Sequence, residues 1–254
     1  MRFLVLGCAG SIAGNRHTTS FLIDDDILID AGTGLGTLPL EALAGIDHVF
    51  LSHSHMDHVA LLPMLVDSTL SLRRRPLVVH AAKSTLETIS EHVFNWKVSP
   101  DFREIRVQGH PAVSFSVLEP GKPVQIGGRS LTAIPVEHSI PTVAYHVDGG
   151  NGSMVVASDM AVSDTFWPVV NAIADLRYLL LETAFQNARL DLCRLSGHLC
   201  PSLLEQELRR LERPADICII HMKPSAEAQI RREIAAFDRD RNIRFLADGD
   251  ILHL

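Results

Sequence analysis

The six residues HSHMDH, positions 53 to 58, hold three histidines and one aspartate. His53 and His55 are two positions apart at the end of an apolar run, so in an extended strand both side chains can point to the same side. Asp57 and His58 follow at the expected start of a helix and would approach the same place from a second direction. Imidazole and carboxylate groups together suit zinc, manganese or iron. A polar helix start with incidental histidines is the alternative, but four candidate ligands in six residues favour a metal site.

Further ligands are expected elsewhere, because a motif of six residues cannot complete the coordination of two ions. His138 ends the run LTAIPVEH, Asp159 ends SMVVASD and His221 ends DICIIH. Each follows an apolar stretch that would deliver its side chain to one edge of a sheet. Each residue alone is compatible with a structural role, but the set taken with HSHMDH predicts a metal centre.

The elements that must position these residues alternate between strand and helix patterns. In the first half we expect strands over residues 2–7, 19–24, 26–32, 48–52 and 76–81, with helices over 34–45, 57–70 and 83–95. In the second half we expect strands over 113–120, 130–138, 142–148, 153–159, 178–183 and 216–221, helices over 166–176, 202–211 and 225–240, and a closing hairpin over 243–254. This repeated order predicts a mixed α/β (α+β) fold, a four-layer αββα sandwich that forms one domain over residues 1–254.

The composition limits the class of partner. The 254 residues include 30 acidic and 23 basic side chains, a net charge of −7, which argues against a large nucleic acid but permits a small anionic substrate. No apolar stretch approaches the roughly 20 residues of a membrane span. The four cysteines contain no CxxC pair, so we expect buried thiols in a reducing, cytoplasmic compartment and no membrane partner. These cysteines are Cys8, Cys193, Cys200 and Cys218.

HSHMDH, the three later residues and the LIDAG turn at positions 28–32 together resemble the metallo-β-lactamase superfamily, whose members are αββα hydrolases. The resemblance implies two divalent ions, with zinc expected and manganese or iron as alternatives. It implies that one ion is held by His53, His55 and His138, that the other is held by Asp57, His58 and His221, and that Asp159 bridges them with a water or hydroxide.

Such a centre suits hydrolysis of a phosphodiester. Two ions about 3.5–4 Å apart can activate a bridging water and clamp both oxygens of an in-line phosphoryl displacement. Asp57 is then both a ligand and a group that orients the remaining proton of the nucleophile. The ions would hold the negative charge that develops during the reaction.

Two downstream residues resemble the branch that contains ribonuclease Z and the class II cyclic-nucleotide phosphodiesterases. Glu182 at a strand end and His198 before a helix match the Glu–His pair that assists departure of the leaving alkoxide in that branch. The alternative for His198 is a solvent-exposed side chain at a helix entry. Lys223 and the Arg73–Arg75 run are either phosphate contacts or solvated surface residues.

The spacing between His138 and Asp159 distinguishes ribonuclease Z from the class II cyclic-nucleotide phosphodiesterases. Ribonuclease Z usually carries a long arm between the ligands that match His138 and Asp159, but here they are 21 residues apart (159 minus 138), with room for a hairpin only. The runs HSHMDHVALLPMLVDS, RHTTSFLID and SGHLCP are similar to the class II phosphodiesterases, with departures at Met56, Ala60 and Leu61.

We therefore predict hydrolysis of 3′,5′-cyclic nucleotides, cyclic AMP first, by attack of a metal-bridging hydroxide, and a homodimer by analogy. Three alternatives stay open. The first is a ribonuclease Z-like tRNA 3′-end endonuclease without the arm, the second a lactonase or thioesterase-type hydrolase, and the third a non-catalytic binding protein.

Overall fold

The computed structural model describes residues 1–238, 241 and 243–254, and the chain divides into two compact units. The first unit contains Met1–Gly7, His17–Leu118 and Asp248–His253, and the second contains Cys8–Arg16, Glu119–Ala247 and Leu254. The expectation of a single domain over residues 1–254 stays a prediction.

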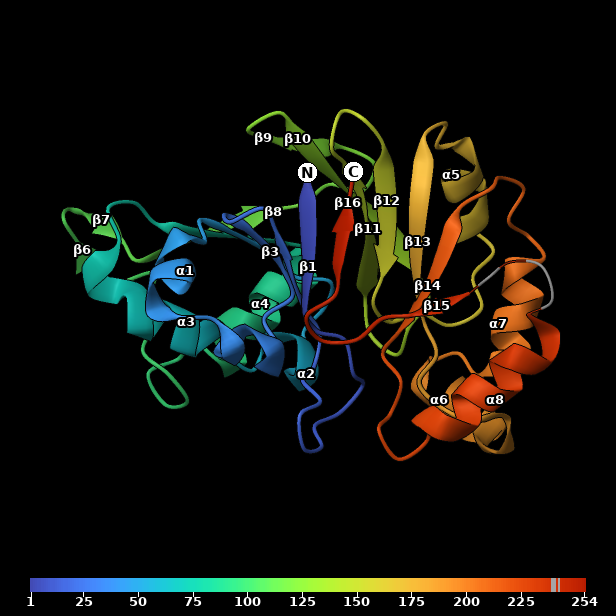
Figure 1. The fold of residues 1–254 in the computed structure, drawn as a ribbon. Coiled ribbons are helices and arrows are strands. Elements are labelled where there is room, and N and C mark those ends of the chain that lie inside the picture. Colours follow the sequence, from blue (N-terminus) through green and yellow to red (C-terminus); the bar gives the residue numbers. More distant parts are fainter. Residues whose placement is uncertain (239–240, 242) are drawn as a thin grey trace. The chain divides into compact units, whose positions relative to one another are not determined.

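The first unit is built on a seven-stranded sheet (Figure 1). The strand order is β16 (Ile251–His253), β1 (Arg2–Gly7), β2 (Ser20–Ile23), β3 (Ile27–Ile29), β4 (His48–Phe50), β5 (Leu77–Ala81) and β8 (Val113–Val117). The pairs from β16 to β3 are antiparallel, and those from β3 to β8 are parallel. The carboxyl ends of β3, β4 and β5 therefore share one edge. A separate two-stranded sheet consists of β6 (Arg106–Val107) and β7 (His110–Pro111).

Short helices cover one face of this sheet. They are α1 (Leu40–Gly45), α2 (Met56–Val59), α3 (Leu62–Thr69) and α4 (Lys83–His92), with 3₁₀ turns η1 (Thr33–Thr37) and η2 (Leu70–Leu72). Val49 and Val79 of the strands are buried in one cluster with Leu65 of α3 and Ile89 of α4. The helix expected over 57–70 is split into α2 and α3, because Pro63 in the first turn of α3 cannot continue a helix from the preceding residues.

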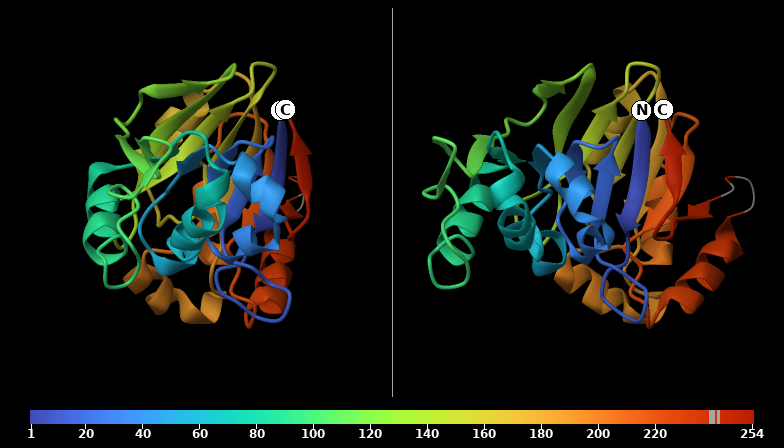
Figure 2. Two further views of the ribbon diagram at one scale, coloured as in Figure 1. Left: turned by 90° about the vertical axis from the view of Figure 1, so that its left-hand side faces the viewer. Right: turned by 60° about the vertical axis from the view of Figure 1, so that its left-hand side comes forward.

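The second unit has its own seven-stranded sheet, shown from two further sides in Figure 2. The order is β15 (Arg244–Phe245), β14 (Asp216–Ile220), β13 (Leu176–Glu182), β12 (Ser153–Ala157), β11 (Thr142–Asp148), β10 (Arg129–Val136) and β9 (Pro123–Ile126). The pairs from β15 to β12 are parallel, and those from β12 to β9 are antiparallel. Strands β10, β12, β13 and β14 consequently run in one direction and end at the same edge.

Four helices pack against one face of this second sheet, the face on which Leu179 and Leu181 lie. They are α5 (Phe166–Ala172), α6 (Leu190–Ser196), α7 (Pro201–Leu208) and α8 (Glu227–Phe237), with a 3₁₀ turn η3 (Asn187–Arg189). Leu179 and Leu181, two positions apart on β13, share one buried cluster with Trp167 of α5 and Ile230 of α8. No helix among the described residues has both the length and the apolar character needed to cross a membrane.

The structure confirms the mixed α/β prediction, with sheets flanked by helices, and the hairpin between His138 and Asp159. The predicted closing hairpin is wrong: β15 pairs with β14, whereas β16 pairs with β1. The sequence pattern of two apolar runs around a turn is the same whether the two strands pair with each other or with other strands. The four cysteines are buried thiols, as predicted. The solvated alternative is wrong for Arg73, because this residue is buried and donates to the Ile46 carbonyl.

Candidate metal and acid-base residues

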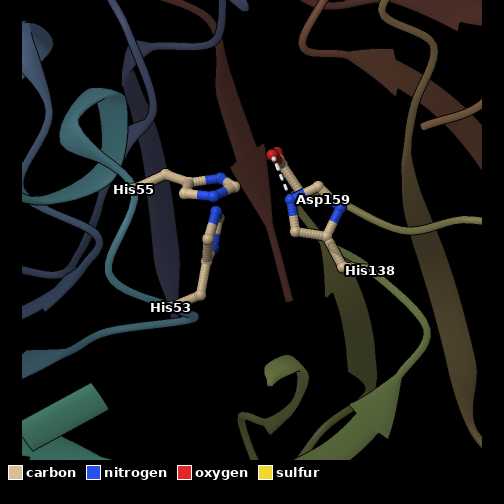
Figure 3. A group of neighbouring side chains, drawn as sticks. All are labelled: His53, His55, His138 and Asp159. Atoms are coloured by element: carbon tan, nitrogen blue, oxygen red, sulfur yellow. Dashed lines mark ion pairs between the residues drawn. The ribbon is translucent and has the colours of Figure 1, made fainter. Parts of the chain in front are cut away.

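The HSHMDH motif lies at the carboxyl edge of the first sheet. Strand β4 ends at Phe50, and α2 begins at Met56. His53 and His58 are fully buried, and their ring centroids are 4.2 Å apart. The rings of His53 and His55 meet edge to face at 4.6 Å (Figure 3). The motif therefore gathers three imidazoles in one place.

A chain of hydrogen bonds fixes the tautomers of two of these histidines. His58 Nδ1 lies 2.8 Å from Asp30 Oδ2, and the Ser52 hydroxyl donates to the same oxygen over 2.8 Å. Because the Ser52 hydrogen is used in this way, its oxygen accepts from His53 Nδ1, 2.9 Å away. Both Nδ1 atoms therefore carry the proton, which leaves the lone pair on Nε2. Histidine ligands of metals are held by such outer hydrogen bonds.

Asp30 and Ser52 hydrogen-bond two of the candidate ligands, and the sequence reasoning did not name either of them. Asp30 follows β3, is fully buried and also accepts the Ser52 backbone N–H over 2.8 Å. Its φ of +57° lies in the left-handed region, where a residue other than glycine is strained, and such strain is common at functional sites. The available signal was an acidic residue directly after a buried apolar strand, in the LIDAG turn.

Asp159, His138 and His221 follow strands β12, β10 and β14 of the second unit. Asp159 Oδ2 lies 3.6 Å from His138 Nε2, and Oδ1 lies 3.2 Å from His221 Nδ1. Figure 3 marks the His138–Asp159 pair with a dashed line. The two carboxylate oxygens thus face different histidines, which is the arrangement a bridging ligand needs.

Two glycines hold these histidines by close backbone approach. The Gly197 carbonyl accepts from His138 Nδ1 over 2.7 Å, which leaves the lone pair on Nε2. Gly197 has a φ of +73°, and a Cβ there would lie 2.7 Å from Ser139 N. A Cβ on Gly10 would lie 2.5 Å from the His221 carbonyl oxygen and 2.9 Å from its ring. Both positions therefore require glycine.

Glu182 and His198 form a buried pair in the second unit. His198 Nδ1 lies 2.8 Å from Glu182 Oε1, and only 8% of the His198 surface is exposed. The alternative of a solvent-exposed His198 is therefore wrong. The Glu182 side chain also accepts three backbone N–H groups, those of Met160, Ala184 and Leu199.

The electrostatics of this pair keep a proton on the imidazole. Burial raises the pKa of Glu182, and the neighbouring His198 opposes that rise. Burial would lower the pKa of His198, but the Glu182 carboxylate and then the charge of Asp159 outweigh it and raise the pKa. Since three backbone N–H groups favour the ionised carboxylate as well, the proton between Glu182 and His198 resides on His198 Nδ1.

The described residues include His/Asp clusters suited to metal binding. The imidazoles and carboxylates of these clusters form the donor set that zinc, manganese or iron accepts. The structure brings four of the predicted residues together in the first unit, namely His53, His55, Asp57 and His58, and five in the second, namely His138, Asp159, Glu182, His198 and His221. Within the second unit, Asp159, His198 and His221 offer ligand atoms that lie within 4.8 Å of one another.

Comparisons with known proteins agree on the fold. The family model described as a beta-lactamase superfamily domain matches residues 25–229. A probable 3′,5′-cyclic-nucleotide phosphodiesterase from Yersinia pestis is 24% identical over 71% of this chain, which spans 58% of that protein. A ribonuclease Z from Methanosarcina mazei is 27% identical over 57% of this chain and 47% of its own length. The solved structure of yeast PDE1 superposes with a TM-score of 0.83 at 18% identity, covering 100% of this chain and 99% of that one.

Proposed function

This chain belongs to the beta-lactamase superfamily and has its metallo-hydrolase fold, and from that premise we propose that it is a binuclear metal-dependent phosphodiesterase. The proposed substrates are 3′,5′-cyclic nucleotides, with cyclic AMP the first to test. The relatives named as cyclic-nucleotide phosphodiesterases support this substrate class. The observation that carries the proposal is the buried Glu182–His198 pair.

Seven residues are proposed as metal ligands. One ion would be held by the Nε2 atoms of His53 and His138 together with His55, and the other by Asp57, His58 and His221, with Asp159 shared between them. The protonated Nδ1 atoms of His53, His58 and His138 support this assignment. So does Asp159, whose two oxygens face different histidines. Two divalent ions bound there would supply an activated water and neutralise charge on the phosphate.

The side chains of this protein would then orient the nucleophile and supply one proton to the leaving group. The Asp57 carboxylate accepts a hydrogen bond from the attacking water and so orients it towards phosphorus. His198, whose Nδ1–H is held by Glu182, donates the proton of Nε2 to the departing alkoxide oxygen. Glu182 stabilises the imidazolium before this transfer and keeps the ring in one orientation.

This role for His198 separates a phosphodiesterase from an esterase of the same fold. Substituting His198→Ala should keep the metal content and lower the turnover of cyclic AMP about 100-fold or more, because the leaving alkoxide is then expelled without an acid. Hydrolysis of bis(p-nitrophenyl) phosphate should change far less, since p-nitrophenolate is a much weaker base. Equal losses on both substrates would refute the acid role of His198.

A substrate panel with zinc-loaded protein tests the proposed class directly. We expect turnover of cyclic AMP or cyclic GMP, and none of a lactone. Cleavage of a precursor tRNA in preference to both cyclic nucleotides would replace this proposal by the ribonuclease Z alternative. That alternative has the support of relatives with that name. The short hairpin of β11 and β12, which leaves no room for an arm, argues against it.

A further inference from the structure

A cavity of about 380 Å³ lies in the second unit, at the sheet edge that carries Glu182 and His221. Three segments form it: the turn after β13, the turn between β14 and α8, and the loop that follows Gly10. Its volume is within the range of small-molecule sites. The side chains that matter to its chemistry are those of Ser11, Ile12, Phe185, Gln186, Arg189 and Lys223.

The cavity lies next to the proposed acid. The Phe185 ring is half-buried, and its centroid lies 5.8 Å from that of His198. On the other side Lys223 follows His221 by two residues, and its Nζ lies 5.8 Å from the Phe185 ring centroid. A ligand in this cavity would therefore reach the residues proposed to cleave a phosphodiester.

Hydrogen bonds and an ion pair within the second unit hold the segments that line the cavity. Lys223 Nζ donates to the Gly10 carbonyl, and the Gly10 N–H donates to Met222 O over 3.1 Å. At the far end of the same loop, Arg16 pairs with Glu227 of α8 at 2.9 Å. The turn after β13 is held by Asn187, whose N–H donates to Glu233 Oε2 over 2.8 Å. The cavity is thus formed by fixed backbone.

Its lining combines an aromatic face with groups that donate hydrogen bonds. Phe185 and the 66% exposed Ile12 provide apolar surface, which a flat ring can cover. Lys223 and Arg189 are cations that can only donate, and none of the lining residues is acidic. Lys223 has three ammonium hydrogens, of which the Gly10 carbonyl takes one. The combination suits an aromatic ring rich in acceptors that is attached to an anionic group.

We propose that this cavity binds the base of a purine nucleotide and favours guanine over adenine. The inference rests on the proposed phosphodiesterase function, because that function determines where the phosphate would lie. The phosphate would be next to His221 and within reach of Lys223. The base lies against Phe185, because nucleobases stack on aromatic side chains. Arg189 donates to the base edge. Guanine offers two acceptors there, O6 and N7, whereas adenine offers one acceptor and one donor.

Calorimetric binding of three monophosphates to the zinc-loaded full chain tests this base subsite. The probes are 5′-GMP, 5′-AMP and ribose 5-phosphate, which share a phosphate and a ribose. We expect 5′-GMP to bind about tenfold more tightly than ribose 5-phosphate, the size of one stacked base. 5′-AMP should lie between them. Equal affinity of 5′-GMP and ribose 5-phosphate would overturn the inference.

Two variants locate the effect. Phe185→Leu keeps apolar volume but removes the ring, so it should abolish the advantage of 5′-GMP over ribose 5-phosphate. Phe245→Leu is the matched control, because Phe245 is also half-buried beneath a cation, with Arg231 Cζ 4.4 Å from its ring, but does not line the cavity. It should keep the advantage. A retained advantage in Phe185→Leu would show that the base binds elsewhere.

A third variant, Arg189→Gln, covers the case in which Phe185→Leu does not fold. Arg189→Gln changes an exposed side chain on η3 and should bring the affinities of 5′-GMP and 5′-AMP together. An unchanged preference in Arg189→Gln would overturn the guanine assignment. The binding data are independent of turnover. Base-dependent binding without hydrolysis of any diester would refute the proposed function alone, and hydrolysis without base-dependent binding would refute the cavity inference alone.

Discussion

Replacing Asp30 by asparagine should weaken metal binding without unfolding the protein. The Asp30 carboxylate accepts from Ser52 N, from Ser52 Oγ and from His58 Nδ1, each over 2.8 Å. Asparagine has the same shape, but one of its two terminal atoms becomes an N–H donor. Whichever way the amide turns, at least one of these three buried donors then faces another donor.

The size of the effect follows from these contacts. Leaving a buried donor without an acceptor costs about 1–3 kcal/mol. His58 is a proposed ligand that this carboxylate orients, so part of the cost should appear as a loss of metal affinity. Substitutions of residues that hydrogen-bond a ligand typically lower metal affinity by about 10–100-fold. We expect Asp30→Asn to fall in that range.

Competition with a chromophoric chelator measures the zinc affinity of the variant, and thermal unfolding of the metal-free protein measures its stability separately. Asp101→Asn is a matched control. Asp101 is another buried carboxylate of the first unit, but it accepts from Arg103 Nε over 2.8 Å and lies outside the His/Asp clusters. It should lose stability and keep its zinc affinity. A folded Asp30→Asn protein that binds zinc as tightly as the unsubstituted protein would refute the positioning role of Asp30.

Two further predictions use features of one unit each. Gly197→Ala should destabilise the protein by more than Gly150→Ala, measured by urea unfolding. Both glycines have positive φ, at a cost of about 1–2 kcal/mol for alanine, but only the Cβ at position 197 meets backbone within 4 Å; equal losses would contradict the close-contact argument. His80, whose pKa is lowered to about 4 by burial and then by His48, is neutral at pH 7. The unfolded chain binds that proton first, so stability should fall by up to about 3 kcal/mol as the pH drops from about 6.5 to 4. In His80→Gln the thermal midpoint should depend less on pH over that window, and an unchanged dependence would disprove this assignment.

Most strands and helices were predictable because apolar periodicity is a local property of the chain. The helix over 57–70 was divided by Pro63, a local signal that was present in the sequence but not used. The closing segment failed for a different reason. A turn between two apolar runs does not encode whether β15 and β16 pair with each other or with β14 and β1.

The sequence by itself determined the chemistry that this protein can attempt. Ligand type is set by residue identity, and HSHMDH concentrates four candidate ligands within six consecutive positions. No long-range contact was therefore needed to propose them as metal ligands. The ends of β10, β12 and β14 were also readable, since each of His138, Asp159 and His221 follows an apolar run.

Only the tertiary structure decided how these side chains are held. Asp30 and Ser52 are 22 positions apart, and the Gly197 carbonyl that fixes His138 comes from 59 positions away. The cavity beside His198 joins three segments that are separate in the chain. Hydrogen-bond geometry and burial depend on distances in space, and apolar periodicity along the chain carries no information about those distances.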